Sequence, residues 1–385
     1  MAERLRIVVN KHTPYAVEAF QQFGDVIALD TLAVTPEAVR DADILIVRSE
    51  TKVNEALLKE SSVRFVGTVT IGTDHVDLEY LSSRGIAFAS APGCNSKSVT
   101  EYIASVLLHI AVQEKFALKG KTIGVVGAGN VGSKVVVMAQ SLGMRVLQND
   151  PPLRRATGDP TYLPLDELMD ADFITLHVPL TKTGEDATVH LFDEHRIARM
   201  KPGAVLINTS RGPVVEPEAL KRALRARHLG AAVLDVWKGE PLVDPELLGF
   251  CLFGTPHIAG HSLDGKVNGL RMVFDKLCEF LSRENQWTLN HLIPVPTEPL
   301  LQIDPRERTV EEDLIHLCRA CYSLEEDDEL LRKISTLPES ERGKYFMRLR
   351  SEYRIRWEFS HYAVDIPTTK QHLIDIVKAL RFQLV

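Results

Sequence analysis

The stretch Thr122-Ile-Gly-Val-Val-Gly-Ala-Gly-Asn-Val-Gly132 decides the fold of this chain. Residues 122–126 have the composition of a buried strand, and residues 131–142 have the apolar spacing of a helix. In a strand-to-helix turn of this kind, one glycine makes the tight turn, one lets the backbone approach a pyrophosphate, and one permits close helix packing. The stretch therefore predicts a nucleotide-binding turn. The residues expected to contact the nucleotide there are Gly127, Gly129, Asn130, Val131 and Gly132.

The residue expected to select the nucleotide follows the next predicted strand, residues 145–149. Asp150 stands there, 18 residues after Gly132. A carboxylate at this position accepts hydrogen bonds from the hydroxyls of an adenosine ribose and repels a 2′-phosphate. We therefore expect NAD as the cofactor. Arg154 and Arg155 keep NADP open as an alternative, because their cations are suited to a 2′-phosphate.

Short apolar runs alternate with helical patterns on both sides of this stretch, which predicts an α/β fold with parallel sheets covered by helices. The alternation breaks at Pro92-Gly93 and restarts at Lys121, so we expect two doubly wound domains of Rossmann or flavodoxin-like type, the second inserted into the first. The expected strands are residues 6–9, 44–47, 65–69, 86–89, 122–126, 145–149, 173–176, 204–207 and 231–234. The expected helices are residues 14–23, 54–58, 76–84, 98–115, 131–142, 193–200, 217–227 and 262–282.

The character of the sequence changes near residue 292. The run Ile293-Pro-Val-Pro-Thr-Glu-Pro299 has the composition of an extended linker. Beyond it, helix-forming residues 311–331, a basic run at 344–357, a strand-like run at 357–364 and a helical pattern at 369–380 predict a small α+β domain. The expected organisation is a substrate-binding domain from residues 1–96, an NAD-binding Rossmann domain at 97–260, a return helix to the first domain at 261–290, and a C-terminal domain at 291–385.

Composition narrows the class of protein. The 385 residues carry 45 Lys+Arg and 52 Asp+Glu, a net charge of −7, which argues against binding nucleic acid or an anionic membrane. The basic run at 344–357 has aromatic residues between its cations, as RNA-binding segments do, but we favour an amphipathic packing helix. No apolar run has the ~18–20 residues of a membrane-spanning helix, and the N-terminus lacks the pattern of a secretory signal.

The five cysteines are few for this length and odd in number, which is typical of a reducing compartment. We therefore expect a cytoplasmic protein. Cys318 and Cys321 have redox-like spacing, but cysteines at i and i+3 are more often ordinary packing residues of one helix face. We expect no metal.

Three polar residues follow predicted strands or strand-like runs in the nucleotide domain. Arg211 lies in Asn208-Thr-Ser-Arg-Gly-Pro, Glu240 in Asp235-Val-Trp-Lys-Gly-Glu-Pro, and His257 in Gly254-Thr-Pro-His-Ile-Ala-Gly. An open α/β sheet binds its ligands at the carboxyl ends of its strands. Arginine suits a carboxylate because its fork makes bidentate contacts, histidine exchanges protons near neutral pH, and a nearby glutamate would orient the imidazole. The set predicts hydride transfer at a hydroxyl carbon, with His257 as base, Glu240 as its orienting group and Arg211 as the cation for the substrate.

Arg211, Glu240 and His257 lie 29 and then 17 positions apart. With Met200-Lys-Pro-Gly-Ala-Val-Leu-Ile-Asn-Thr-Ser-Arg-Gly, this spacing resembles the D-isomer-specific 2-hydroxyacid dehydrogenase family over about residues 5–285. The resemblance implies an NAD-dependent oxidoreductase in which Arg211 and Glu240 are catalytic and His257 is the proton donor and acceptor. It also implies NAD contacts from Asp150, Val178, Thr209, Ser210, Arg211, Asp235 and Gly260.

Five further stretches are similar to one member of that family, which acts on a small phosphorylated 2-hydroxy acid and carries an additional C-terminal dimerisation domain. They are Val47-Arg-Ser-Glu-Thr-Lys-Val-Asn54, Phe65-Val-Gly-Thr-Val-Thr-Ile-Gly-Thr-Asp-His-Val-Asp77, Ala91-Pro-Gly-Cys-Asn95, Asp150-Pro-Pro152 and Thr255-Pro-His-Ile-Ala-Gly-His-Ser-Leu-Asp-Gly-Lys266. This likeness implies a homodimer formed through residues 291–385.

Substrate contacts are expected mainly from the first domain. The likeness implies Ser49 and Thr70, and it implies position 261, where His261 replaces the usual tyrosine. Arg48 follows a predicted strand and offers a cation for an anionic substrate, although a neighbouring acid would be an equally good partner for it. Two other functions stay open: a dehydrogenase for another 2-hydroxy acid such as 3-phosphoglycerate, and a non-catalytic NAD-sensing protein.

Overall fold

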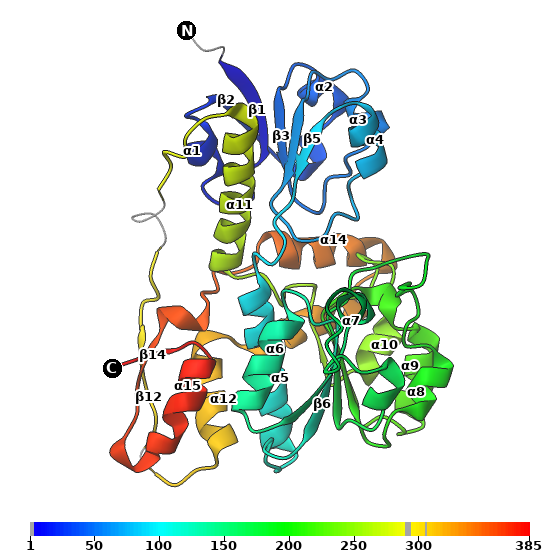
Figure 1. Cartoon of the computed structure of the whole chain (residues 1–385), viewed down its shortest axis with the longest axis vertical. Helices are drawn as coiled ribbons and strands as arrows, with labels where there is room; N and C mark the ends of the chain where they lie inside the picture. Colours follow the sequence, from blue (N-terminus) through cyan, green and yellow to red (C-terminus); the bar gives the residue numbers. More distant parts are fainter. Residues whose placement is uncertain (1–3, 289–293, 305) are drawn as a thin grey trace. The chain divides into compact units, whose positions relative to one another are not determined.

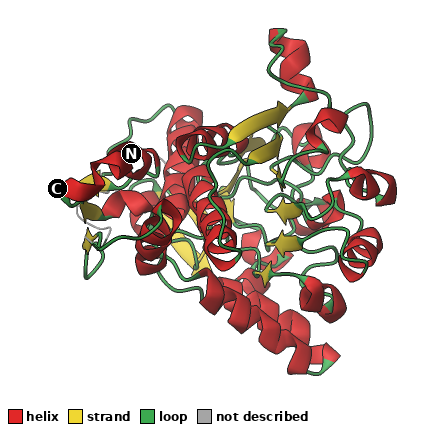
Figure 2. Cartoon of the chain, turned by 90° about the horizontal axis from the view of Figure 1, so that it is seen from below, coloured by secondary structure: helices red, strands yellow, loops and turns green. Residues whose placement is uncertain are grey.

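The structure is a computed structural model that describes residues 4–288, 294–304 and 306–385 (Figure 1). It divides into two compact units, which are Met1–Asn95 with Ser262–Pro294, and Ser96–His261 with Val295–Val385. The expected boundary at residues 290/291 and the first residue of the expected linker, Ile293, lie outside the described residues. Helices flank the strands throughout (Figure 2), and all strand pairs between named strands are parallel. The prediction of an α/β chain with doubly wound parallel sheets is confirmed.

The first unit is built on a five-stranded parallel sheet of order β2-β1-β3-β4-β5. Because successive side chains point to opposite faces, Ile44 packs on one face with Phe274 of α11, while Leu45 packs on the other with Leu81 of α4. The strands are β1 (Leu5–Asn10), β2 (Gly24–Leu29), β3 (Ile44–Val47), β4 (Phe65–Thr68) and β5 (Ala87–Ala89). The helices are α1 (Ala16–Phe20), α2 (Pro36–Val39), α3 (Glu55–Leu58), α4 (Leu78–Ser83) and α11 (Leu263–Leu281), with a 3₁₀ turn at Thr31–Ala33.

The second unit contains a six-stranded parallel sheet of order β11-β10-β9-β8-β6-β7, with α5 and α6 on one face. Its strands are β6 (Thr122–Val126), β7 (Arg145–Asn149), β8 (Phe173–Leu176), β9 (Val205–Asn208), β10 (Ala231–Leu234) and β11 (Phe253–Gly254). Its helices are α5 (Ser96–Gln113), α6 (Gly132–Ser141), α7 (Pro151–Thr157), α8 (Glu194–Arg199), α9 (Pro217–Arg225) and α10 (Pro245–Phe250), with 3₁₀ turns at Leu165–Leu168 and Gly212–Val214.

The C-terminal segment, residues 295–385, belongs to the same unit as this sheet. Its apolar side chains, such as Leu314 and Val377, share one core with Val106 of α5 and Val135 of α6. It forms a three-stranded parallel sheet of order β12-β13-β14, from β12 (Leu300–Gln302), β13 (Ala363–Asp365) and β14 (Gln383–Leu384). Its helices are α12 (Val310–Cys321), α13 (Leu324–Arg332), α14 (Glu339–Ser351) and α15 (Ile374–Ala379), with 3₁₀ turns at Lys333–Thr336, Phe359–His361 and Thr368–Leu373.

Several elements differ from the sequence-based expectation. Short elements of two to seven residues were not predicted, namely helices α2, α7 and α10 and strands β11, β12 and β14. Strand β2 was not predicted, since only its first residue, Gly24, is buried and the strand lies at the sheet edge. The helical pattern at 311–331 is two helices, because the Ser323 side chain accepts a hydrogen bond from Glu326 N and begins a new helix. The strand-like run at 357–364 is mostly turn, with a strand only from Ala363.

Candidate functional site

The glycine loop between β6 and α6 fits the close approach of a pyrophosphate. Gly127 has a positive φ of 87°, and a Cβ there would lie 2.7 Å from the carbonyl oxygen of His177. A Cβ at Gly132 would lie 1.8 Å from the carbonyl oxygen of Gly127. The fold itself therefore requires these two glycines. At Gly129, by contrast, no atom beyond the adjoining residues lies within 4 Å of the position that a Cβ would take, and the residue is exposed. Open space at this glycine is what a bound phosphate group requires.

Asn130 and Val131 complete the loop. Asn130 is exposed and its carbonyl accepts a hydrogen bond from Lys134 Nζ at 2.8 Å, while half-buried Val131 directly precedes α6. The first turn of α6 therefore directs backbone N–H groups toward the loop, where the helix dipole favours negative charge.

Asp150 holds this loop as well as offering a carboxylate. Its Oδ2 accepts a hydrogen bond from Ala128 N at 2.9 Å, and its Oδ1 accepts one from Leu153 N at 3.0 Å, which begins α7. Arg155 forms ion pairs with Glu185 and Asp186, and Arg154 Nη1 donates to the carbonyl of Tyr162. Both arginines are thus engaged by the protein, which weakens the case for NADP.

The loops after β8 and β9 carry Val178, Thr209, Ser210 and Arg211. Val178 is half-buried, with its Cγ1 3.0 Å from where a Cβ on Gly127 would lie. Ser210 donates from N and from Oγ to Asn208 Oδ1, and Arg211 Nη1 donates to the carbonyl of Ser210 at 2.8 Å. A Cβ at Gly212 would lie 2.1 Å from the carbonyl carbon of Trp237, so only glycine lets the Arg211 loop approach the segment after β10.

His177 is a site residue that the sequence did not identify. Its Nδ1 lies 3.3 Å from Thr209 Oγ1 and its Nε2 lies 3.0 Å from Thr175 Oγ1. Burial lowers the pKa of His177 to about 3, so the imidazole is neutral and joins the loops after β8 and β9 by hydrogen bonds.

His257 and Glu240 form a hydrogen-bonded pair at the carboxyl edge of the sheet. His257 Nδ1 lies 2.8 Å from Glu240 Oε2, and Glu240 Oε1 accepts a hydrogen bond from Trp237 N at 2.7 Å. Burial raises the pKa of Glu240, but the charge and hydrogen bond of His257, the Trp237 N–H and the charge of Arg350 together lower it. Glu240 is therefore an ionised acceptor for the imidazole. The His257 side chain keeps 33% of its surface exposed, so a substrate can reach it.

The loop that carries His257 is held in a strained conformation. His257 has φ of +57°, a left-handed backbone that costs a residue other than glycine of order 1–3 kcal/mol. His257 N donates to the carbonyl of Asp235 at 2.7 Å. Asp235 Oδ1 accepts hydrogen bonds from Thr255 Oγ1 at 2.6 Å and Ile258 N at 2.8 Å, and its Oδ2 accepts one from Ala259 N at 3.0 Å.

Asp235 is 2% exposed, and its carboxylate is turned toward the residue 255–259 loop. The pKa of Asp235 is raised overall, because the effect of burial outweighs the lowering by His257 and by these hydrogen bonds. Gly260 follows that loop and is half-buried. His261 stacks edge-on against Tyr353 of the C-terminal segment, with ring centroids 5.8 Å apart.

The expected substrate residues of the first unit lie after neighbouring strands. Arg48 and Ser49 follow β3 and Thr70 lies two residues after β4, and β3 pairs with β4, so all three lie at one sheet edge. Arg48 is 8% exposed, with Nη1 donating to the carbonyl of His12 at 3.1 Å and Nε 3.8 Å from Glu50 Oε2. Ser49 is half-buried, and Thr70 Oγ1 lies 2.8 Å from Thr68 Oγ1.

Lys266 of α11 adds a second cation to this edge. Burial and the nearby positive charge of Arg48 lower the pKa of Lys266 to about 8, against the opposing charge of Glu50. Glu50, 3.8 Å from Arg48 Nε, offsets part of this positive charge, and a further anion nearby would stabilise both cations. Sequence reasoning missed Lys266 because it is distant from Arg48 along the chain and follows no strand.

Several other expectations concern absences. Among the described residues, no helix combines the length and apolar character that crossing a membrane requires. Over the same part of the chain, no group of three or more His, Cys, Asp or Glu side chains is arranged to hold a metal ion. Burial raises the pKa of the Cys318 thiol to about 12 and also raises that of Cys321, which makes both poor nucleophiles.

Known proteins resemble this chain over most of its length. Residues 108–259 match the family described as D-isomer specific 2-hydroxyacid dehydrogenase, NAD binding domain, and residues 294–380 match a domain of unknown function (DUF3410). Erythronate-4-phosphate dehydrogenase of Shewanella sp. (strain ANA-3) is 43% identical over 94% of each chain. That of Azotobacter vinelandii is 43% identical over 98% of this chain and 99% of the relative.

Solved structures agree with this likeness. The NAD+-bound 3-phosphoglycerate dehydrogenase of Entamoeba histolytica has a TM-score of 0.63 and 25% identity, over 76% of this chain and all of that one (100%). The D-lactate dehydrogenase of Aquifex aeolicus with NAD and lactic acid has a TM-score of 0.60 and 27% identity, over 72% of this chain and 95% of that one. The chain therefore belongs to the D-isomer-specific 2-hydroxyacid dehydrogenases that bind NAD, in the family whose curated members are named erythronate-4-phosphate dehydrogenase.

Proposed function

We propose that this chain oxidises 4-phospho-D-erythronate to (R)-3-hydroxy-2-oxo-4-phosphooxybutanoate with NAD, as a step in the synthesis of pyridoxal 5′-phosphate. The names of the relatives suggest the substrate. The observation that carries the chemistry is the 2.8 Å contact between His257 Nδ1 and Glu240 Oε2, at the sheet edge where the glycine loop also ends.

His257 is the proposed proton acceptor. Ionised Glu240 accepts a hydrogen bond from the Nδ1–H of the imidazole, which leaves the lone pair on Nε2. Nε2 then takes the proton of the substrate hydroxyl, and the same carboxylate stabilises the imidazolium that forms. Bound NAD supplies the hydride acceptor. Arg211 binds the substrate carboxylate, because its planar fork can donate to both carboxylate oxygens. Its positive charge also polarises the carbonyl that develops at C2.

The residues proposed to hold NAD lie along one sheet edge. Gly127, Gly129, Asn130, Val131 and Gly132 cradle the pyrophosphate, and Asp150 accepts hydrogen bonds from the adenosine ribose. Val178, Thr209, Ser210, Asp235 and Gly260 follow strands β8 to β11 and complete the contacts expected from the family. Since the carboxylate of Asp235 already accepts three hydrogen bonds, its proposed contribution runs through the position of the residue 255–259 loop.

The first unit is proposed to recognise the anionic substrate. Arg48 and Lys266 supply positive charge, and Ser49 and Thr70 supply hydroxyl donors. His261 is proposed as a further contact in place of the tyrosine of related enzymes. In this assignment residues 1–96 and 261–290 form the substrate-binding domain, residues 97–260 bind NAD, and residues 291–385 mediate dimerisation.

A cytoplasmic homodimer is the proposed form of the enzyme. Strands β12 and β14 are both edges of the three-stranded sheet of the C-terminal segment, and that segment exposes apolar side chains at Leu300 (52%) and Ile355 (55%). Exposed apolar groups and open sheet edges are features that a subunit contact would cover.

The test is turnover by the purified full-length chain. NADH absorbance is followed after adding NAD with 4-phospho-D-erythronate, and separately with D-3-phosphoglycerate and D-lactate. We expect the highest kcat/KM with 4-phospho-D-erythronate. A higher value with 3-phosphoglycerate would reassign the substrate, and NAD binding without turnover of any 2-hydroxy acid would make the chain an NAD-sensing protein.

A further inference from the structure

The C-terminal segment contacts residues that directly precede the 255–259 loop, which is called the His257 loop below. Asp328 Oδ1 of α13 accepts a hydrogen bond from Gly254 N at 2.7 Å. Arg332, held by Asp328 Oδ2 at 2.7 Å, donates to the carbonyls of Leu248, Cys251 and Leu252 at 3.2, 2.9 and 3.2 Å. Helix α13 thus fixes strand β11 and the turn before it, three residues from His257.

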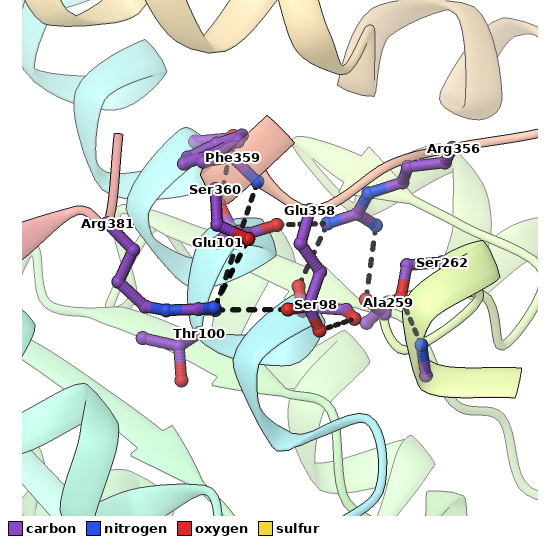
Figure 3. Close-up of polar contacts among 12 residues, drawn as sticks. Ser98, Thr100, Glu101, Ala259, Ser262, Arg356, Glu358, Phe359, Ser360 and Arg381 are labelled. Atoms are coloured by element: carbon purple, nitrogen blue, oxygen red, sulfur yellow. Dashed lines mark hydrogen bonds and ion pairs between the residues drawn. The ribbon is translucent and has the colours of Figure 1, made fainter. Parts of the chain in front are cut away.

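Arg356 fixes the other end of the same loop (Figure 3). Its Nη1 donates to the carbonyl of Ala259 at 3.1 Å, and its Nη2 donates to the carbonyl of Ser98 in α5 at 2.8 Å. The guanidinium is 4.0 Å from the ring centroid of Tyr322 and the residue is 2% exposed. Because Asp235 accepts from Ala259 N, both the N–H and the carbonyl of Ala259 are fixed, two residues after His257.

The position of Arg356 is itself set by buried partners. Its Nη2 lies 3.9 Å from Glu101 Oε2, and the neighbouring Glu358 accepts hydrogen bonds from Ser98 Oγ at 3.1 Å and from Arg381 at 3.1 Å. Glu101 Oε1 accepts from Phe359 N at 2.9 Å. Figure 3 shows these side chains converging from α5, from the loop and 3₁₀ turn that precede β13, and from the loop before β14. Arg356 is therefore held rigidly against α5.

A second part of the segment lies beside Glu240. A Cβ on Gly343 of α14 would lie 3.4 Å from the side chains of both Pro241 and Leu242, directly after Glu240. Arg350 of the same helix contributes positive charge at the Glu240 carboxylate. Helix α14 thus contacts the two residues that follow Glu240, the hydrogen-bond partner of His257.

We propose that the C-terminal segment is a positioning element for catalysis: Asp328, Arg332 and Arg356 clamp the His257 loop while α14 supports Glu240. A left-handed residue such as His257 keeps its conformation only where its surroundings impose it, and this segment supplies contacts on both sides. The inference rests on the proposed role of the His257–Glu240 pair. It gives residues 295–385 a role within each subunit, besides any part in dimerisation.

The test compares Arg356→Met with Lys370→Met in the full-length enzyme. Lys370 is the matched control, because it also forms a buried ion pair within the segment, with Asp313 Oδ2 at 2.5 Å. Displacing a catalytic group by about 1 Å can cost about 100-fold in rate, so we expect Arg356→Met to lower kcat by roughly 10- to 100-fold. KM for NAD should change little, and Arg356→Lys should restore part of kcat, since one donor can still reach one carbonyl. Lys370→Met should lower the melting temperature and leave kcat near that of the wild type.

A second readout does not depend on the substrate. The imidazole signals of His257, observed by NMR with isotope-labelled histidine and assigned with His257→Asn, should move in Arg356→Met and stay in place in Lys370→Met. If wild-type enzyme turns over no 2-hydroxy acid, the proposed function fails while this comparison still decides the inference. If both variants leave kcat and the His257 signals unchanged, the segment does not position the pair and the inference is wrong.

Asp328 provides a variant pair should Arg356→Met fail to fold. Asp328→Asn keeps an oxygen to accept from Gly254 N, whereas Asp328→Ala removes it. We expect Asp328→Ala to lower kcat more than Asp328→Asn. Equal kcat values in both variants and the wild type would overturn the proposal.

Discussion

Alanine at two glycines of the nucleotide loop should have opposite effects on stability and on NAD binding. In Gly132→Ala the new Cβ would lie 1.8 Å from the backbone oxygen of Gly127, which cannot swing away as a side chain would. The loop or helix α6 must shift, and overpacking of this kind costs about 1–3 kcal/mol. In Gly129→Ala no atom beyond the adjoining residues lies within 4 Å of the new methyl group, so we expect the free energy of unfolding to change by less than about 0.5 kcal/mol.

For NAD binding, by contrast, we expect a large effect at Gly129. A methyl group at Gly129 occupies the space proposed for the pyrophosphate, and it would separate the phosphate from at least one backbone donor. A hydrogen bond to a charged group is worth about 1.5–3 kcal/mol, so Gly129→Ala should raise the Kd for NAD by roughly 10- to 150-fold. Denaturant unfolding of the protein without NAD and calorimetric titration with NAD measure the two effects. A Gly129→Ala variant that binds NAD like the wild type would refute the placement of the pyrophosphate at this loop.

Three further predictions concern the cofactor, the substrate and assembly. Wild-type kcat/KM should strongly favour NAD over NADP, and Asp150→Ala should narrow that preference. Asp150→Asn keeps an oxygen that accepts from Leu153 N, so it separates the loss of charge from the loss of that helix cap. A wild-type ratio near one would contradict the role of Asp150. Burial and Arg48 hold the pKa of Lys266 at about 8, so its ammonium is charged below that pH and neutral above it. KM for the phosphorylated substrate should therefore rise as pH passes about 8 in the wild type, and should stay high at all pH values in Lys266→Met. A wild-type KM that does not change with pH would exclude Lys266 from the site. Light scattering should give twice the chain mass of 43.0 kDa, and a single-chain mass would refute the homodimer.

Much of the fold was predictable because its signals are local. Strands β3, β6, β8 and β10 have the predicted bounds, since each is a short, largely buried apolar run between polar turns. Strand β7 also has the predicted bounds, although it is an edge strand in which only Asn149 is buried. Strand β2 escaped because an edge strand with exposed residues lacks that pattern. The break between α12 and α13 escaped because it contains neither glycine nor proline, and only the cap formed by Ser323 marks it.

The candidate site was predictable where residues follow strands. Arg211, Glu240 and His257 come soon after β9, β10 and β11, and parallel strands end at one edge of the sheet. The sequence could not show that Nδ1 of His257 faces Glu240, or that the His257 backbone is left-handed, because both depend on tertiary packing. Contacts such as that of Arg356 with Ala259 join residues 97 positions apart and leave no local pattern.

The pH dependence of kcat/KM for 4-phospho-D-erythronate, compared between the wild type and Glu240→Gln, tests the central claim most directly. Oxidation requires the neutral imidazole of His257, so kcat/KM should rise with pH until the proton is lost. Ionised Glu240, 2.8 Å from Nδ1, stabilises the imidazolium, and glutamine keeps the shape of the side chain without the charge. We expect Glu240→Gln to lower kcat/KM and to move the midpoint of the rising limb to lower pH. Superimposable profiles would show that Glu240 does not act on His257 and would contradict the proposed mechanism.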